Sequence, residues 1–365
     1  MGKTLSPDPF LTFAANVLHE RLTTLQQALV QVRKEGDIDA VHDARVASRR
    51  LRSGLALLEE ATGRKKFRRW RRQIRNVTQA LGELRDTDVQ LLLVNHRLEQ
   101  PEVAENGQAG LTWVQQRLQR KRKQEYRQVR KDIGRLRRKE TLEAMAEAWQ
   151  KWQEGENTGS AMDPVVRDQA RPLVLAHLAE TELLNDPLPP AEQTEELHAL
   201  RLALKRLRYT LEFVAPAFAG QLDGYVTTLK GLQEILGDLH DADVWVTRLP
   251  RFLTKQEKRL RRKGTPPEER SQILADLEAL LDDRRLHRAE LYEQLHEDWQ
   301  EQEQRGTWTR LRQLLEPEVS KQTEPAVPPA LPAETSSPPP AHEDEAPAQN
   351  QEKTVERTTT TLTLS

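Results

Sequence analysis

"VHDARVASRRLR" at residues 41–52 and "LHALRLALKRLR" at residues 197–208 are two versions of one pattern. In each, a histidine is followed by basic residues three, seven and ten positions later, among leucines and alanines. This spacing has the period of an α-helix, so both stretches are predicted to be helical. The chain is therefore expected to contain an internal repeat built from helices.

On a helical wheel, the charged residues of each stretch gather on one face. With His42 at 0° and roughly 100° per residue, Arg45, Arg49 and Arg52 all fall within an arc of about 80°. Leucines and alanines lie on the opposite side and are expected to pack against other helices. Because like charges at three- and four-residue spacings repel one another, a stripe that occurs twice suggests that an anion neutralises it.

The composition favours a helical protein. Charged residues make up 31% of the 365 residues, and Leu, Ala, Glu, Arg and Gln, which are strong helix formers, dominate. The chain has no cysteine, which excludes disulfides and thiolate metal sites and fits a reducing compartment. Since no apolar run reaches the ~18 residues of a membrane span, we expect a cytoplasmic protein without membrane contact.

The net charge of -1 hides an uneven distribution of charge. Residues 41–138 hold 25 basic and 11 acidic residues, a net of +14, and this local excess indicates an anionic partner. Residues 317–365 are instead rich in Pro, Ala, Thr and Glu. Such a segment cannot bury enough apolar surface to offset its ordering entropy, so a disordered tail is expected.

The repeat extends beyond the two histidine stretches. "IRNVTQALGELRDTDV" at 74–89 matches "LKGLQEILGDLHDADV" at 229–244, and a weaker match places Arg122 opposite Arg284. The prediction is an all-α fold of two pseudo-symmetric four-helix-bundle repeats. Repeat one is expected at residues 10–153, a linker at 154–163 and repeat two at 164–316.

Two aspartates recur within the second motif. Asp86 and Asp88 in the first copy correspond to Asp241 and Asp243 in the second. We expect a new helix to begin after each pair, with one carboxylate as its N-cap. The other carboxylate is expected to orient a nearby arginine.

Glycines and helix starts are expected to open the cationic face to a ligand. Gly82 and Gly237 lie near this face, where a missing side chain would allow close approach. His42 is expected in the first turn of its helix, after a cap from Asp37 or Asp39. Free N–H groups and the helix dipole favour an anion there.

The paired motifs also resemble those of a known family. "HxxRxxxRRLR" and "HxxRxxxKRLR", followed by "LGELRDTDV" and "LGDLHDADV" respectively, are similar to the CHAD family, the conserved histidine α-helical domain. The resemblance covers about residues 10–315. It implies two helical bundles whose basic residues line a central channel, binding of inorganic polyphosphate and association with polyphosphate granules.

The resemblance implies that the two stripes face each other across the channel. No catalytic residue, cofactor or metal is expected, and enzymes of polyphosphate metabolism or granule proteins are further candidate partners. Because the second copy has fewer arginines after its motif, the two walls are expected to contribute unequally. The candidate polyphosphate-binding residues are His42, Arg45, Arg49, Arg52, Arg68, Arg72, Arg75, Arg122, His198, Arg201, Lys205, Arg208, Lys230 and Arg284.

Two other functions stay open at the level of sequence. Residues 117–138 are basic on every face and would suit a nucleic-acid backbone, although they offer almost no aromatic side chains for base stacking. His42–Asp43 and His240–Asp241 resemble the pairs of metal-dependent phosphohydrolases, but they fall at non-equivalent places in the repeat. No Walker loop and no strand pattern of a triphosphate-tunnel domain is present, so no phosphoryl-transfer machinery is predicted.

The histidines carry a pH-dependent expectation. Nearby cations should depress the protonation of His42 and His198 in the empty protein, whereas a bound polyanion should favour it. Binding is then expected to strengthen as the pH falls from ~8 toward ~6.

Overall fold

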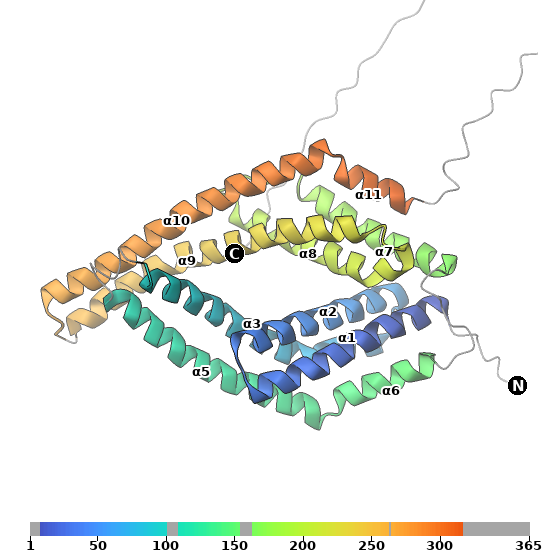
Figure 1. The fold of residues 1–365 in the computed structure, drawn as a ribbon, viewed down its shortest axis with the longest axis horizontal. Helices are drawn as coiled ribbons and strands as arrows, with labels where there is room; N and C mark the ends of the chain where they lie inside the picture. Colours follow the sequence, from blue (N-terminus) through green and yellow to red (C-terminus); the bar gives the residue numbers. More distant parts are fainter. Residues whose placement is uncertain (1–7, 101–108, 154–162, 263, 317–365) are drawn as a thin grey trace, which may run out of the picture. The chain divides into compact units, whose positions relative to one another are not determined.

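The fold of the computed structural model is helical (Figure 1). The structure describes residues 8–100, 109–153, 163–262 and 264–316. No residue in these ranges forms a β-strand, which confirms the all-α prediction. The predicted tail at 317–365 and nearly all of the predicted linker lie outside the described residues.

The described part of the first half contains one more helix than the four predicted for each repeat. Asp37 caps the second helix by accepting a hydrogen bond from the backbone N–H of Ala40 at 2.8 Å, as one of the two predicted caps. Gly63 ends the same helix with a φ of 63°, a left-handed conformation that suits glycine. The helices are α1 (Pro9–Lys34), α2 (Ile38–Thr62), α3 (Lys65–Leu98), α5 (Ala109–Arg138) and α6 (Thr141–Gln153).

The second half repeats this order of long and short helices. Its histidine helix, α8 (Thr194–Val214), is followed by a short 3₁₀ segment at Ala215–Phe218. The last, short helix, α11 (Thr307–Leu315), stands in the same place in the order as α6 does in the first half. The helices are α7 (Pro164–Leu183), α8 (Thr194–Val214), α9 (Asp223–Arg262), α10 (Pro267–Gln304) and α11 (Thr307–Leu315).

The predicted helix breaks at the aspartate pairs do not exist. Helices α3 and α9 run without interruption through these positions, so the predicted N-caps are wrong. The prediction that one carboxylate of each pair orients an arginine is confirmed. Buried Asp88 accepts a hydrogen bond from Arg122 of α5 at 2.6 Å, and Asp243 accepts one from Arg288 of α10 at 2.5 Å. These ion pairs outweigh the low helix propensity of aspartate.

Matched contacts define which residues of α5 and α10 are equivalent. Tyr126 follows Arg122 by one turn, and Tyr292 follows Arg288 by the same interval. Each tyrosine hydroxyl donates to a backbone carbonyl that lies ahead of its histidine helix, at 2.9 Å and 3.1 Å. Arg122 is therefore equivalent to Arg288, and the sequence match with Arg284 is wrong by four residues.

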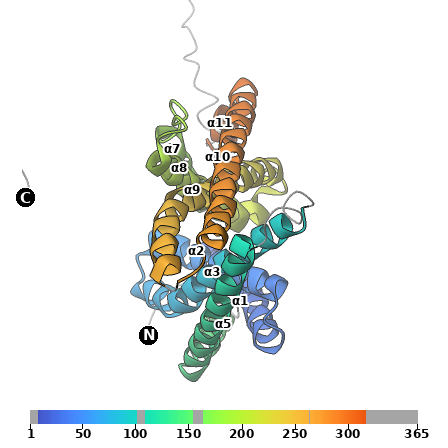
Figure 2. The ribbon, with the colours of Figure 1, turned by 90° about the vertical axis from the view of Figure 1, so that its left-hand side faces the viewer.

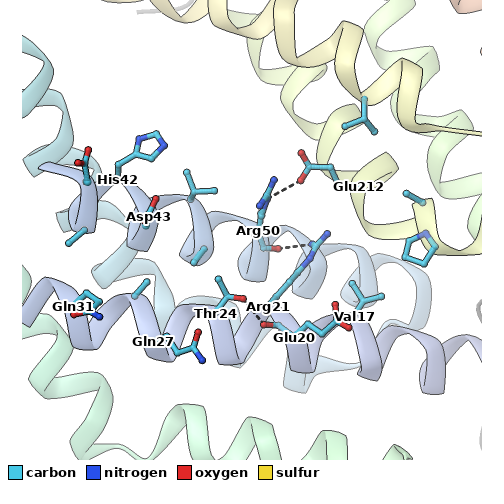
Figure 3. A pocket seen from close by; sticks show the side chains of 18 of the residues that line it. Val17, Glu20, Arg21, Thr24, Gln27, Gln31, His42, Asp43, Arg50 and Glu212 are labelled. Carbon is cyan, nitrogen blue, oxygen red and sulfur yellow. Dashed lines mark hydrogen bonds and ion pairs between the residues drawn. The ribbon is translucent and has the colours of Figure 1, made fainter. Parts of the chain in front are cut away.

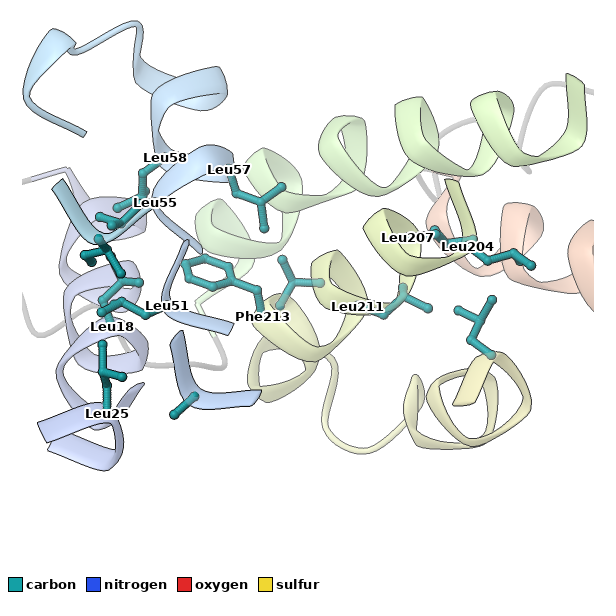
Figure 4. Close-up of a cluster of buried hydrophobic side chains, with 14 of the residues drawn as sticks. Leu18, Leu25, Leu51, Leu55, Leu57, Leu58, Leu204, Leu207, Leu211 and Phe213 are labelled. Carbon is teal, nitrogen blue, oxygen red and sulfur yellow. The ribbon is translucent and has the colours of Figure 1, made fainter. Parts of the chain in front are cut away.

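A large apolar core joins the two histidine helices (Figure 4). Leu51 and Leu55 of α2 are buried in this core together with Phe213 of α8. A Cβ atom at Gly54 would lie 2.7 Å from Cδ2 of Leu18 and 3.0 Å from Cε2 of Phe213. Glycine at this position therefore lets α2 and α8 approach closely toward their C-terminal ends.

A second apolar cluster joins the four longest helices at a different place (Figures 1 and 2). It combines the C-terminal part of α3 with the N-terminal part of α5, and the corresponding parts of α9 and α10. The two halves of the chain are therefore joined both here and where α2 meets α8. The buried residues are Leu91, Val94, Leu111, Val114, Leu118, Leu249, Leu260, Ile273, Leu277, Leu280 and Leu281.

Candidate polyanion-binding site

The cationic stripes of α2 and α8 come together as one group, here called the cationic cluster. Burial and the neighbouring guanidinium groups, with Arg49 first among them, lower the pKa of Lys205 to about 7. The positive charge of Arg45 on α2 likewise acts on Arg201 of α8. Such cross-helix effects require the two stripes to lie close together. The cluster consists of Arg45, Arg49, Arg52, Arg201, Lys205 and Arg208.

The apolar side of each stripe holds the cluster in place. In α2, Ala44, Ala47 and Leu51 are buried, and in α8 Leu200 and Leu207 are buried. Burying these residues fixes the rotation of both helices. As the wheel predicted, the cations then share the face that the core leaves free.

An aromatic ring lies beneath the cluster. The guanidinium carbon of Arg49 lies 5.9 Å from the centre of the Tyr209 ring, and that of Arg208 lies 4.9 Å from it. Cation–π attraction of this kind positions both guanidinium groups. Tyr209 was not among the residues predicted from the sequence, although it directly follows the last basic residue of the second stripe.

Several buried N–H donors of the cluster have no hydrogen-bond partner within the described part of the chain. They are the Nε atoms of Arg45, Arg49 and Arg52. Nε of Arg208 likewise forms no hydrogen bond, although it lies 3.6 Å from Oε1 of Glu212. A buried donor without an acceptor costs roughly 1–3 kcal/mol. Oxygen atoms of a phosphate chain are acceptors of the kind that a guanidinium group binds with two parallel hydrogen bonds.

Carboxylates adjoin the cluster at several described residues. The charges of Asp241 and Arg201 act on each other, so these two side chains lie close together. Arg45 lies 3.8 Å from Asp86, and Arg208 lies 3.6 Å from Glu212. Glu212 also forms an ion pair with Arg50 at 3.1 Å, so it is shared between two arginines. The cluster therefore keeps an excess of positive charge.

The histidines lie in the second turn of their helices rather than the first, each as the fifth helical residue. Burial and then Arg201 lower the pKa of His198, whose ring lies 4.7 Å from that of His240. Partial desolvation and then Arg85 lower the pKa of His42. The direction agrees with the expectation, but desolvation is the leading cause. At this position the helix N-terminus contributes little, because its dipole acts within the first turn.

Helix α3 extends the cluster on one side. Burial, then Arg71 and Arg75, lower the pKa of Arg52, so these three cations lie close together. Arg75 was among the predicted ligands, whereas Arg71, which lies four residues earlier on the same helical face, was not. A Cβ at Gly82 would lie 3.9 Å from Nε of Arg45, which agrees with the predicted place of this glycine beside the stripe.

Two predicted ligands serve other contacts. Arg122 is held by buried Asp88 and also donates to the carbonyl of Gly36 at 2.9 Å, so it connects α5 to α3 and to the turn before α2. Arg284 donates to the neighbouring Asp283 at 2.6 Å. The structure does not bring either arginine to the cationic cluster.

Three more predicted residues lie at exposed positions on α3 and α9. Arg68 forms an ion pair with Glu59, and Lys230 lies 3.7 Å from Glu234. Arg72 is exposed on α3. These residues add positive charge around the cluster without joining the group between α2 and α8.

A pocket of about 990 Å³ lies beside α2, and Figure 3 shows it from close by. His42 lies at its edge, and Arg50 reaches across toward Glu212. The remaining lining includes Glu20 and Asp39, and Arg45, Arg49 and Arg52 are not part of it. This mixed lining distinguishes the pocket from the cationic cluster.

Two further properties concern metals and membranes. Across the described residues, no group of three or more His, Cys, Asp or Glu side chains is placed to hold a metal ion. Among the same residues, no helix combines the length and the apolar character needed to cross a membrane.

The family relationship follows from comparison with known proteins. The family model of the CHAD domain matches residues 16–250. A CHAD domain structure from the plant Ricinus communis has a TM-score of 0.54 and 23% sequence identity, covering 80% of this chain and 95% of that chain. PptA from Streptomyces chartreusis has a TM-score of 0.55 and 17% identity, covering 81% of this chain and 100% of that chain. A search of curated proteins found no match. Both structures support the fold, and because the family model spans more than half of the sequence, the chain belongs to the CHAD domain family.

Proposed function

We propose that this protein binds inorganic polyphosphate in the cationic cluster of α2 and α8, and that it does so without catalysing a reaction. The observation that supports this most directly is the convergence of two like-charged stripes with buried, unpartnered Nε donors. Holding these cations together opposes folding through desolvation and repulsion. A linear polyanion between the helices neutralises the charges and supplies the acceptors that the donors lack.

Each type of cation has its own part in binding. The arginines offer forked donors for two oxygens of one phosphate, whereas Lys205 offers a single compact charge. Tyr209 holds the guanidinium groups of Arg49 and Arg208 before the ligand arrives. Since less side-chain freedom is then lost on binding, this arrangement favours affinity.

The proposal extends to the setting of the protein. A non-enzymatic polyphosphate binder would reside with polyphosphate granules in the cytoplasm. Its partners would be proteins of the granule or enzymes that make or degrade the polymer. The function of the family, as implied by the sequence resemblance, supports this setting.

Nucleic acid is the competing ligand, because its backbone carries the same phosphate charges. One observation favours polyphosphate at the cluster. Tyr209, the aromatic residue beside the cations, is only 3% exposed and is covered by them, so it offers no surface for base stacking. Polyphosphate has no bases to stack, so the lack of an exposed aromatic surface does not reduce its affinity.

The proposal is tested by competition between the two polyanions. Labelled long-chain polyphosphate is bound to the full chain and displaced with unlabelled polyphosphate or duplex DNA at low and at physiological salt. We expect polyphosphate to compete at far lower phosphate concentration, and binding to weaken steeply with salt as phosphate contacts do. If DNA displaces the label equally well at physiological salt, the cluster is a general phosphate-backbone site and the proposal fails.

A further inference from the structure

The outer side of α5 carries a row of cations, here called the α5 face. Its members fall within about 60° on either side of Gly134, at roughly 100° per residue, and are all exposed. From the first to the last, the row extends about 27 Å along the helix at 1.5 Å per residue. The α5 face consists of Arg120, Lys123, Arg127, Arg130, Lys131, Arg137 and Arg138.

These cations have no carboxylate partner among the described residues. The two acids of α5 are used elsewhere, since Glu125 lies 3.3 Å from Lys121 and Asp132 accepts from Arg135 at 3.0 Å. The negative end of the helix dipole favours Arg137 and Arg138 in the last turn. It acts over one turn only and does not account for the rest of the face.

The α5 face ends in a concave site. A pocket of about 580 Å³ is lined by four cations of α5, by Gly134 and by Arg33 from α1. A Cβ at Gly134 would lie 3.5 Å from Nη1 of Arg138, so a longer side chain would extend into this space. Glycine inside a helix costs about 1 kcal/mol relative to alanine, and here it keeps the pocket open.

The fold itself does not require this charge. With Arg122 equivalent to Arg288, the residues of α10 that correspond to Arg127, Lys131 and Arg137 are glutamates. They are Glu293, Glu297 and Glu303. The same helix position in the second half therefore carries the opposite charge.

We infer that the α5 face is a second binding site for inorganic polyphosphate, separate from the cationic cluster, so that one molecule holds two segments of the polymer. The inference rests on the proposed function. Helices α2 and α3 lie between α5 and α8 in both ribbon views (Figures 1 and 2), and the two sites share no residue. Two sites on one molecule bind a long chain with avidity and can connect separate chains.

The test counts binding sites by isothermal titration calorimetry with tripolyphosphate, which is too short to connect the two sites. The full chain is compared with R130H/K131E/R137E, which places the α10 residues on α5. A control, K255E/K258E/R262Q, makes the same change of charge at exposed positions of α9. R33Q/R138Q provides a milder second variant, and thermal unfolding checks that each variant is folded.

We expect two sites in the full chain and in the control, and one site in each α5 variant. R49Q/K205Q should lose the other site, so failure of the cluster is seen separately from failure of the α5 face. If the full chain has a single site and R49Q/K205Q removes it, this inference is overturned while the proposed function stands. Loss of duplex DNA binding in the α5 variants, with both tripolyphosphate sites kept, would make the α5 face a nucleic-acid surface and overturn it as well.

Discussion

The two halves of the molecule share an internal framework but differ in their surfaces. Each has an arginine on a long helix that pairs with an aspartate and donates to a backbone carbonyl just before the histidine helix. A tyrosine one turn later donates to another carbonyl ahead of that helix. The outer faces of α5 and α10 carry opposite charge. Features that are present in both halves, such as these contacts and the cationic stripes, belong to the fold and to the shared cationic cluster. The α5 face is present in one half only among the described residues, and it is a separate feature.

The cationic stripes also differ between the halves. On α8, burial and the neighbouring arginines lower the pKa of Lys205 to about 7, whereas on α2 burial lowers the pKa of Arg49 only to about 10. Between pH ~7 and ~9, the basic residues of the second stripe therefore respond to pH more strongly than those of the first. The two stripes, with three basic residues each, therefore differ in proton binding.

The largest effect is expected where the shared framework is broken. Asp88→Ala leaves Arg122 without its partner beneath α5 and should lower the free energy of unfolding by about 3 kcal/mol, as for other disrupted buried pairs. Asp243→Ala should cost less, because the side chain of Asp243 is 16% exposed and that of Asp88 is fully buried. Urea unfolding of the two variants measures both changes. Equal losses of unfolding free energy would show that the difference in burial between Asp88 and Asp243 does not affect stability.

The next effect concerns ligand binding. R49Q/K205Q removes one cation from each stripe and should weaken polyphosphate binding by at least about 100-fold, since each of the two charged hydrogen bonds contributes roughly 1.5–3 kcal/mol. R285Q/R305Q is the matched control, because both arginines are exposed and paired with surface carboxylates. Fluorescence anisotropy with labelled polyphosphate measures the affinities. A similar loss in the control would mean that only total charge matters.

A smaller effect, the pH dependence of affinity, should distinguish the two stripes. A bound polyanion raises the pKa of Lys205 from about 7, so binding takes up a proton above that pH. Affinity should therefore fall by at most about tenfold per pH unit between pH ~7 and ~9. Lys205→Arg keeps the charge and should flatten this dependence. His42→Ala with His198→Ala should act only at lower pH, because both histidine pKa values are lowered.

The stability of the ligand-free protein should change with pH in the opposite direction to its affinity. The folded pKa of Lys205 lies below its unfolded value of ~10.4, so the unfolded chain binds more protons over this range. The free protein should thus become more stable as the pH rises from about 7 toward 10. Lys205→Met should raise the midpoint of thermal unfolding and weaken this slope. An unchanged slope would show that Lys205 is not desolvated.

The sequence allowed much of this architecture to be predicted. Helical period and charge placed Arg45, Arg49 and Arg52 on one face, because an apolar face fixes the rotation of a helix. The continuity of α3 and α9 was not predicted, because the pairing of Asp88 with Arg122, which offsets the low helix propensity of aspartate, joins residues far apart in the sequence. Tyr209 was missed because its packing beneath the cations depends on how α8 crosses α2, which sequence period does not determine.

The central claim is that the stripes of α2 and α8 form one site, and a double-mutant cycle tests it most directly. Polyphosphate affinity is measured for the full chain, R49Q, K205Q and the double variant at constant pH and salt. If one segment of ligand contacts both helices, the effects of the single substitutions should depart from additivity by about 0.5 kcal/mol or more. Additive effects, within roughly 0.3 kcal/mol, would show that the stripes act independently and would contradict the claim.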